Sequence, residues 1–146
     1  MTARYMSMTS HEVRKAMSQC WRIRKELKAK ENALQEIRSK AEKMTSSFSQ
    51  TPGGHGETAS RVEHYAVQLV EMQEDMEDAT EALLVAMRKA QRMIELAPDP
   101  LQRAALTEYH LNGKTAEETA ASIGYSERQI FRLMGSAYEY IAKMMS

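Results

Sequence analysis

Residues 115–130, TAEETAASIGYSERQI, decide the fold of the C-terminal part of this 146-residue chain. Thr115 and Ser126 are each followed three residues later by Glu or Gln, the capping-box pattern that begins a helix. Ala120 offers the small side chain needed where two helices cross, and Gly124 can adopt the left-handed turn between them. These spacings predict a helix-turn-helix whose second helix starts after Ser126.

The second helix of this motif has one apolar face and one polar face. We expect it to bury Ile130, Leu133, Met134 and Ala137 and to leave Glu127, Arg128, Phe131, Arg132 and Gly135 or Ser136 outward. Arginine can donate two hydrogen bonds to a guanine edge, glutamate accepts from cytosine, and phenylalanine contacts a thymine methyl group. The residues expected to read DNA bases are Glu127, Arg128, Gln129, Phe131 and Arg132. The alternative is a solvated face, or one whose arginines pair with nearby acids.

Four other residues are placed to contact the DNA backbone. Arg103 and Lys114 supply positive charge, while Thr115 and Ser126 stand at helix starts, where free backbone amides donate hydrogen bonds to phosphates.

Two further signals complete a three-helix domain over residues 98–146. Asp99-Pro100 predicts a helix start, with Asp as the cap and Pro in the first turn. Asn112-Gly113 predicts left-handed residues that end this helix.

Two long heptad repeats precede this domain. The first places Val13, Ala16, Cys20, Ile23, Leu27, Lys30, Leu34, Ile37, Ala41 and Met44 on one seam. The second does so for Val62, Tyr65, Leu69, Met72, Met76, Ala79, Leu83, Ala86, Ala90 and Met93. Capping boxes predict helix starts at Thr9 and Ser60, and the Gly- and Ser-rich residues 45–59 predict a loop. The expected fold is therefore all-α, with residues 1–97 as an antiparallel coiled-coil hairpin and residues 98–146 as the helix-turn-helix domain.

The charges are unevenly distributed, although twenty Lys and Arg balance twenty Asp and Glu. Residues 1–44 carry +6, residues 45–97 carry −5 and residues 98–146 carry −1. The first two values favour pairing between the two long helices, within one chain or swapped between chains. The third is unfavourable for a domain that binds DNA alone, because affinity for DNA comes largely from phosphate neutralisation. We therefore expect help from a dimer, from RNA polymerase or from the basic first helix.

Apolar residues outside the seams require cover near the base of the hairpin. They are Met17, Trp21, Leu84, Met87 and Ile94. We expect the C-terminal domain or another subunit to cover them, because such patches are uncommon on a free surface. The alternative is that the helices simply have broad apolar faces.

Other classes of function find no support in the sequence. The only cysteine, Cys20, lies on the first seam, and no histidine has the spacing of a metal ligand. The carboxylates at Glu74, Asp75, Glu77, Asp78 and Glu81 form a solvated face, because seam residues between them are apolar. We expect no enzyme activity, no metal and no cofactor. The absence of an apolar N-terminal run predicts a protein of the cytoplasm without a membrane span.

The decisive stretch also carries a family resemblance. Residues 115–130, followed by Ala137-Tyr138, resemble region four of bacterial sigma factors, which reads the upstream promoter element. The charged hairpin, its Gly- and Ser-rich loop and the segments YHLNGKT (109–115) and GYSERQI (124–130) are similar to small phage and prophage regulators of late genes. The resemblance implies DNA binding in the cytoplasm of a bacterial host cell, with RNA polymerase as a further candidate partner. Gln129 and Phe131 stand where sigma factors usually have arginine, so we expect a private DNA site.

Three hypotheses follow from the sequence. The first is a phage-type, sequence-specific DNA-binding transcription regulator that acts as a homo-oligomer, preferably a dimer. The second is a DNA-packaging or assembly protein like the small terminase subunits. The third is an adaptor whose hairpin docks on an RNA polymerase subunit.

Overall fold

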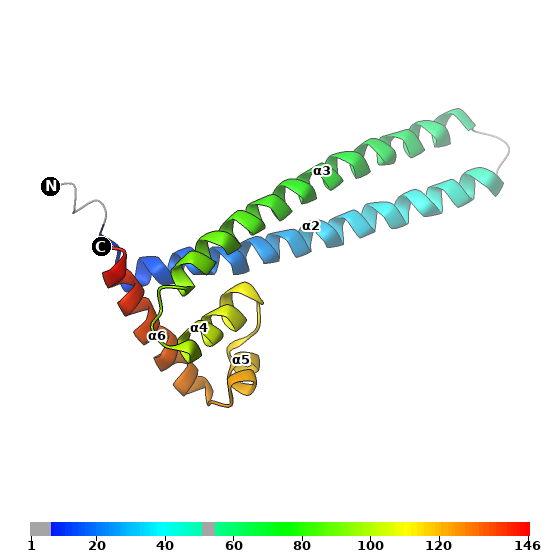
Figure 1. Ribbon diagram of the computed structural model, residues 1–146. Helices are drawn as coiled ribbons and strands as arrows, with labels where there is room; N and C mark the ends of the chain where they lie inside the picture. The colour runs from blue at the N-terminus through cyan, green and yellow to red at the C-terminus, as the bar shows by residue number, and fades with distance from the viewer. Residues whose placement is uncertain (1–6, 51–54) are drawn as a thin grey trace. The chain divides into compact units, whose positions relative to one another are not determined.

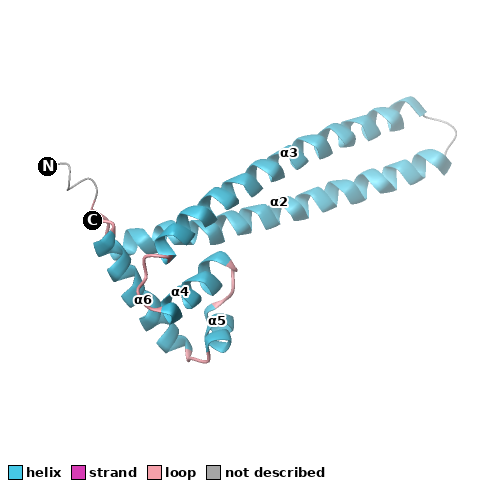
Figure 2. Ribbon diagram, viewed as in Figure 1, coloured by secondary structure: helices cyan, strands magenta, loops and turns pink. Residues whose placement is uncertain are grey.

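The computed structural model describes the backbone of residues 7–50 and 55–146 and the side chains of residues 7–46 and 59–146. Two long helices, α2 (Ser10–Gln50) and α3 (His55–Ile94), form an antiparallel hairpin (Figure 1). Then follow α4 (Pro100–Leu106), the π-helical segment η1 (Thr107–Leu111), α5 (Ala116–Ile123) and α6 (Glu127–Met144). Loops join these helices, and the described residues contain no strand (Figure 2). The predicted all-α fold is confirmed.

The chain divides into two compact units, through both of which α2 and α3 run. The terminal unit comprises Met1–Arg24 and Ala82–Ser146, and the middle unit comprises Lys25–Glu81. This division differs from the sequence-based boundary between residues 97 and 98. The last three helices share a core with the neighbouring ends of α2 and α3, which groups residues 98–146 with these two helix ends in one compact unit.

The core of the terminal unit joins all of its helices. Its buried members are Val13, Met17 and Cys20 of α2, Ala90, Met93 and Ile94 of α3, Ala97, and the inner faces of α4, α5 and α6. Met17 and Ile94 are therefore covered by the C-terminal helices, as the sequence predicted, and Met87 packs half-buried against them. Burial also raises the pKa of the Cys20 thiol, which makes it less reactive.

The middle unit is held by the two heptad seams. Leu34 and Ala79 are buried, and the other described seam residues of this unit are half-buried, as the repeats predicted. Lys30, the polar residue on the first seam, keeps its ammonium group 3.6 Å from the Glu26 carboxylate. The five carboxylates between Glu74 and Glu81 are exposed, as expected.

Two sequence predictions about the hairpin loop are wrong. α2 continues to Gln50 and α3 begins at His55, so residues 45–50 and 55–59 of the predicted loop are helical. Residues 51–54, which include Gly53 and Gly54, lie outside the described residues. Ser60 lies within α3 instead of capping it. Gly and Ser lower helix propensity by at most about 1 kcal/mol each, so the helices continue across them.

The helix starts predicted elsewhere are confirmed. The Glu12 amide donates to the Thr9 hydroxyl over 3.2 Å where α2 begins. Asp99 caps α4 by accepting from the Leu101 amide over 3.0 Å, and Gln102 completes a capping box that the sequence analysis did not identify.

The end of η1 is clamped to the hairpin by an arginine. The Arg24 guanidinium of α2 donates to the Leu111 carbonyl and lies 3.8 Å from the Met87 sulfur. Gly113 has a φ of +70°, as predicted, but Asn112 is right-handed, with a φ of −86°. A side chain at position 113 would meet Arg24 Cδ at 3.3 Å. Gly113 thus serves both the turn and the clamp.

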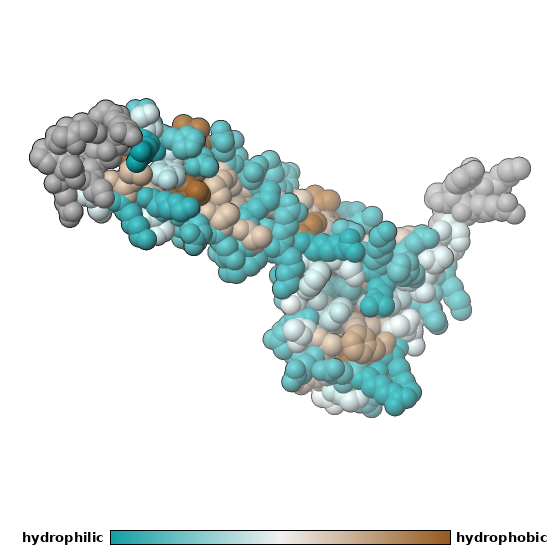
Figure 3. All heavy atoms as spheres, turned by 180° about the vertical axis from the view of Figure 1, so that it is seen from behind, coloured by the Kyte–Doolittle hydropathy of each residue, from teal (hydrophilic) through white to brown (hydrophobic). Residues whose placement is uncertain are grey.

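Some large apolar side chains of the terminal unit remain in solvent. Trp21 is 54% exposed, Leu84 50% and Val85 60%, so the C-terminal helices do not cover Trp21 and Leu84, and of the two expected covers only another subunit is left for them. Figure 3 shows hydrophobic side chains among hydrophilic ones on one face of the molecule. These residues belong neither to the two heptad seams nor to the core of the terminal unit.

Replacing Gly113 with alanine should destabilise the protein. A non-glycine residue with positive φ costs about 1–2 kcal/mol, and the added methyl group would also press on Arg24. We expect the free energy of unfolding, measured with urea, to fall by at least about 1 kcal/mol. Gly135→Ala is the matched control, because a Cβ there meets no atom within 4 Å. Equal stability of the two variants would contradict the clamp.

Candidate nucleic-acid interface

The turn between α5 and α6 has the predicted helix-turn-helix geometry. The Thr115 hydroxyl accepts from the Glu118 amide over 3.1 Å and caps α5. Gly124 adopts a φ of +82°, and its amide donates to the Ala120 carbonyl over 2.9 Å. Ser126 then caps α6. The caps and the glycine therefore set where each helix starts and where the turn reverses.

The two faces of α6 lie as the spacing predicted. Ile130, Met134 and Ala137 are buried and Leu133 is half-buried. The exposed residues in the first ten positions of α6 are Glu127, Arg128, Gln129, Phe131, Arg132 and Ser136, and Gly135 is half-exposed. The outward face of this helix is therefore free to meet a partner.

Arg128 and Arg132 lie four residues apart on that outward face. Neither forms an ion pair with an acidic side chain in the described part of the chain, and Glu127 does not pair with them. The alternative in which nearby acids neutralise these arginines therefore has no support. Both guanidinium groups keep their donors available for a base edge or a phosphate.

Gln129 has a structural role that competes with base reading. Its Oε1 accepts from the Ser126 amide over 2.9 Å, while the Ser126 hydroxyl accepts from the Gln129 amide over 3.2 Å. The sequence predicts this capping box, and it also predicts that Gln129 contacts DNA bases. The cap leaves only the side-chain NH₂ of Gln129 for such a contact.

The expected backbone contacts already have partners within the chain. Arg103 Nη1 donates to the Ala97 carbonyl over 2.6 Å and holds the connection before α4. Lys114 pairs with Glu108 and donates to the Ser122 hydroxyl over 3.2 Å. The hydrogen bond from Lys114 holds the pKa of the Glu108 carboxyl below its ordinary value. The charge of Lys114 is therefore largely compensated.

The start of α5 is acidic, which weakens it as a phosphate site. Glu117 and Glu118 occupy its first turn, and the Glu118 carboxylate accepts from the Thr115 amide over 3.0 Å. This backbone hydrogen bond lowers the pKa of Glu118. Carboxylates in this position satisfy the helix terminus that a phosphate would otherwise occupy.

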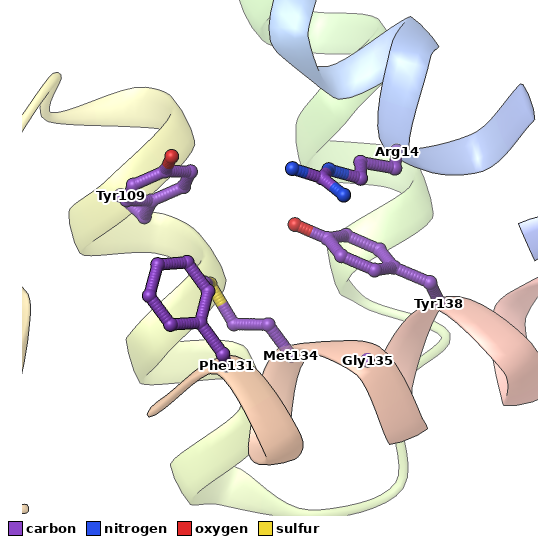
Figure 4. Close-up of a pocket in the computed structure, with 6 residues that line it drawn as sticks. All are labelled: Arg14, Tyr109, Phe131, Met134, Gly135 and Tyr138. Atoms are coloured by element: carbon purple, nitrogen blue, oxygen red, sulfur yellow. The ribbon is translucent and has the colours of Figure 1, made fainter. Parts of the chain in front are cut away.

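A pocket beside α6 includes a residue that the sequence analysis missed (Figure 4). Arg14, Tyr109, Phe131, Met134, Gly135 and Tyr138 line a space of about 160 Å³. Arg14 comes from α2, Tyr109 from η1 and the other four from α6. No local pattern could identify Arg14, because it is more than a hundred residues from Phe131 in the chain. The only signal was the excess of positive charge in residues 1–44.

The terminal unit as a whole is positively charged. It contains thirteen Lys and Arg against eight Asp and Glu, a net charge of +5, while the middle unit contains seven against twelve, a net charge of −5. The helix-turn-helix segment alone has a net charge of −1. Its shared core with the ends of α2 and α3 brings their basic residues into the same compact unit.

A buried polar pair fixes η1 against α6. His110 Nε2 and the Tyr138 hydroxyl share a hydrogen bond of 2.7 Å, and both residues are less than 10% exposed. Burial, with a smaller effect of the Arg14 charge, lowers the pKa of His110 to about 4. Burial raises the pKa of Tyr138 well above its ordinary value. Both groups are therefore neutral at physiological pH.

Neither a metal site nor a membrane span is found in the described residues. No three side chains from His, Cys, Asp and Glu lie close enough to hold an ion there. None of the helices in residues 7–50 and 55–146 is both long and apolar enough to cross a membrane. No family model, curated protein or solved structure matches this chain. The function of this chain is therefore inferred from its own residues and their contacts.

The buried histidine predicts a loss of stability in mild acid. The unfolded chain binds a proton near pH 6.5, whereas folded His110 does so only near pH 4. The free energy of unfolding should therefore fall as pH decreases through this window. Above pH 7, His110 should contribute no pH dependence, because it is neutral in both the folded and the unfolded state. We expect a decrease of about 2 kcal/mol between pH 7 and pH 5 in urea titrations.

A pair of variants isolates this effect. His11→Gln, which changes an exposed histidine of the same unit, should keep the full pH dependence. The double variant His110→Phe with Tyr138→Phe removes both members of the buried pair and should lose it. If this double variant showed the same decrease, another group would be responsible.

Proposed function

We propose that the protein is a sequence-specific, double-stranded-DNA-binding regulator of transcription, with α6 as its recognition helix. The observation that carries the proposal is the pair Arg128 and Arg132, which are exposed on one face of a helix that begins with a capping box and form no ion pair with a described acidic side chain. Two arginines at this spacing suit the major groove, where each can contact a guanine.

The fold supplies the rigidity that base reading requires. Ile130, Met134 and Ala137 anchor the inner face of α6 in a core shared by every helix of the terminal unit. A firmly seated helix presents its outward side chains in one arrangement, which favours recognition of a specific sequence. Arg128, Arg132 and Phe131 are therefore the main candidates for contacts with DNA bases, and Glu127 is a further candidate.

Electrostatics support binding by the terminal unit as a whole. The net charge of −1 in residues 98–146 is unfavourable, but the complete unit carries +5. We propose that the exposed basic residues of α2 in the terminal unit contribute phosphate contacts in place of Arg103 and Lys114, whose donors are engaged within the chain. The expected contacts with the DNA backbone are thereby proposed for the part of α2 up to Arg24 instead of for the helix-turn-helix.

The sigma-region-four and phage character of the proposal rests on the residues of segments 109–115 and 124–130. A homodimer, or association with RNA polymerase, would add affinity to a single recognition helix. The adaptor hypothesis is favoured by a specific observation, the exposed apolar side chains of Trp21, Leu84 and Val85. Binding of polymerase by these residues is compatible with DNA reading by α6.

Removing Arg128 should weaken binding at one base pair. After selection of preferred sites from random duplexes, we expect Arg128→Ala to cost about 1–3 kcal/mol at the selected site and to relax preference at one position. Fluorescence anisotropy with the selected duplex and single-base variants measures both effects.

Lys143→Ala is the matched control for this experiment. Lys143 is an exposed cation on the same helix, about 16 Å further along its axis than Arg132. Its removal should leave base preference unchanged. The proposal fails if the purified protein selects no sequence at low salt, alone or with polymerase. Uniform weakening by Arg128→Ala on all duplexes would make Arg128 a phosphate contact.

The solution mass separates the regulator from the packaging hypothesis. We expect a monomer or, preferably, a dimer in light-scattering or native mass measurements, because dimeric readers match the two-fold symmetry of their sites. An assembly of eight or more subunits would contradict this expectation and would favour a ring that gathers DNA.

A further inference from the structure

The pocket beside α6 has walls of two different chemical kinds (Figure 4). On one side lie the Arg14 guanidinium and the hydroxyl of Tyr138, and Tyr109 faces them across the space. The Phe131 ring and the Met134 thioether form the other side. A volume of about 160 Å³ is close to that of cavities that hold one benzene ring.

Arg14 provides an uncompensated positive charge at this pocket. It forms no ion pair with any acidic side chain in the described part of the protein. A planar guanidinium binds a carboxylate through two parallel hydrogen bonds. The Arg14 side of the pocket therefore fits an anionic group.

Gly135 keeps the pocket open. It lies in the interior of α6, where glycine is less favourable than alanine, and a Cβ placed on it would meet no atom within 4 Å. Packing within the chain thus gives no reason for a glycine here. Close approach of a bound group to the helix backbone is a use for which glycine is suited.

We propose that this pocket binds a small monocyclic aromatic carboxylate. The ring would pack between Phe131 and Tyr109, and the carboxylate would accept hydrogen bonds from Arg14. A free phosphate would leave the Phe131 and Met134 wall without an apolar partner, whereas a neutral hydrocarbon would cover Arg14 without compensating its charge. An aromatic acid satisfies both walls.

This inference goes beyond the proposed function, because ligand binding here requires no DNA. Its consequence for that function is direct, since Phe131 and Gly135 belong to the helix proposed to read bases. A ligand in contact with Phe131 would change which atoms of this side chain a thymine can reach. The pocket is thus positioned as an effector site.

The probe for this site is 4-fluorobenzoate, followed by ¹⁹F NMR on the full chain without DNA. A ligand of about ten heavy atoms should bind saturably, with a dissociation constant on the order of 1 mM. Benzoate should displace it, whereas benzyl alcohol and acetate, which lack the charge and the ring respectively, should be at least about tenfold weaker competitors. No binding at up to roughly ten times that concentration would overturn the proposal.

Two variants and their matched controls locate the binding. Arg14→Gln should weaken binding at least about tenfold by removing the charge, and Gly135→Leu should abolish it by filling the pocket. Lys15→Gln and Ser136→Leu alter exposed neighbours in the same way and should bind normally. Thermal unfolding verifies that each variant is folded. Binding unchanged by both pocket variants, or equal competition by acetate, would contradict the proposed site.

Discussion

The shared apolar core of the terminal unit is the constraint on which the remaining structure depends. Val13 and Met17 near the start of α2, Ile94 at the end of α3, and Ile130 and Met134 of α6 are all buried in it. This core buries one face of each helix in the unit, and it packs the inner face of α6 against the neighbouring ends of α2 and α3.

This packing changes the electrostatic character of the helix-turn-helix. The segment alone has a slight negative charge, but the core places it in a unit of charge +5. It also brings Arg14 to the edge of α6 and directs Arg24 onto the Leu111 carbonyl. Two arginines of one helix thus have different tasks, because one is held by a backbone carbonyl and the other faces an open pocket.

Much of this architecture was predictable because it depends on local patterns. The heptad seams, the caps at Thr115 and Ser126 and the turn at Gly124 each involve residues that are close in sequence, and all are present in the structure. Weak local signals were less reliable. The Gly- and Ser-rich segment predicted as a loop is longer than the connection between α2 and α3, since a few unfavourable residues do not stop a helix that packs against a partner helix.

Local patterns in the sequence specify the helical class, the turn at Gly124 and the outward residues of α6, since periodicities and caps act over three or four residues. Tertiary packing specifies which cations surround α6 and which of them are already engaged: it pairs Lys114 with Glu108 and places Arg14 beside Phe131. These contacts depend on how distant segments share one core, and side-chain spacing along a helix carries no information about a partner a hundred residues away.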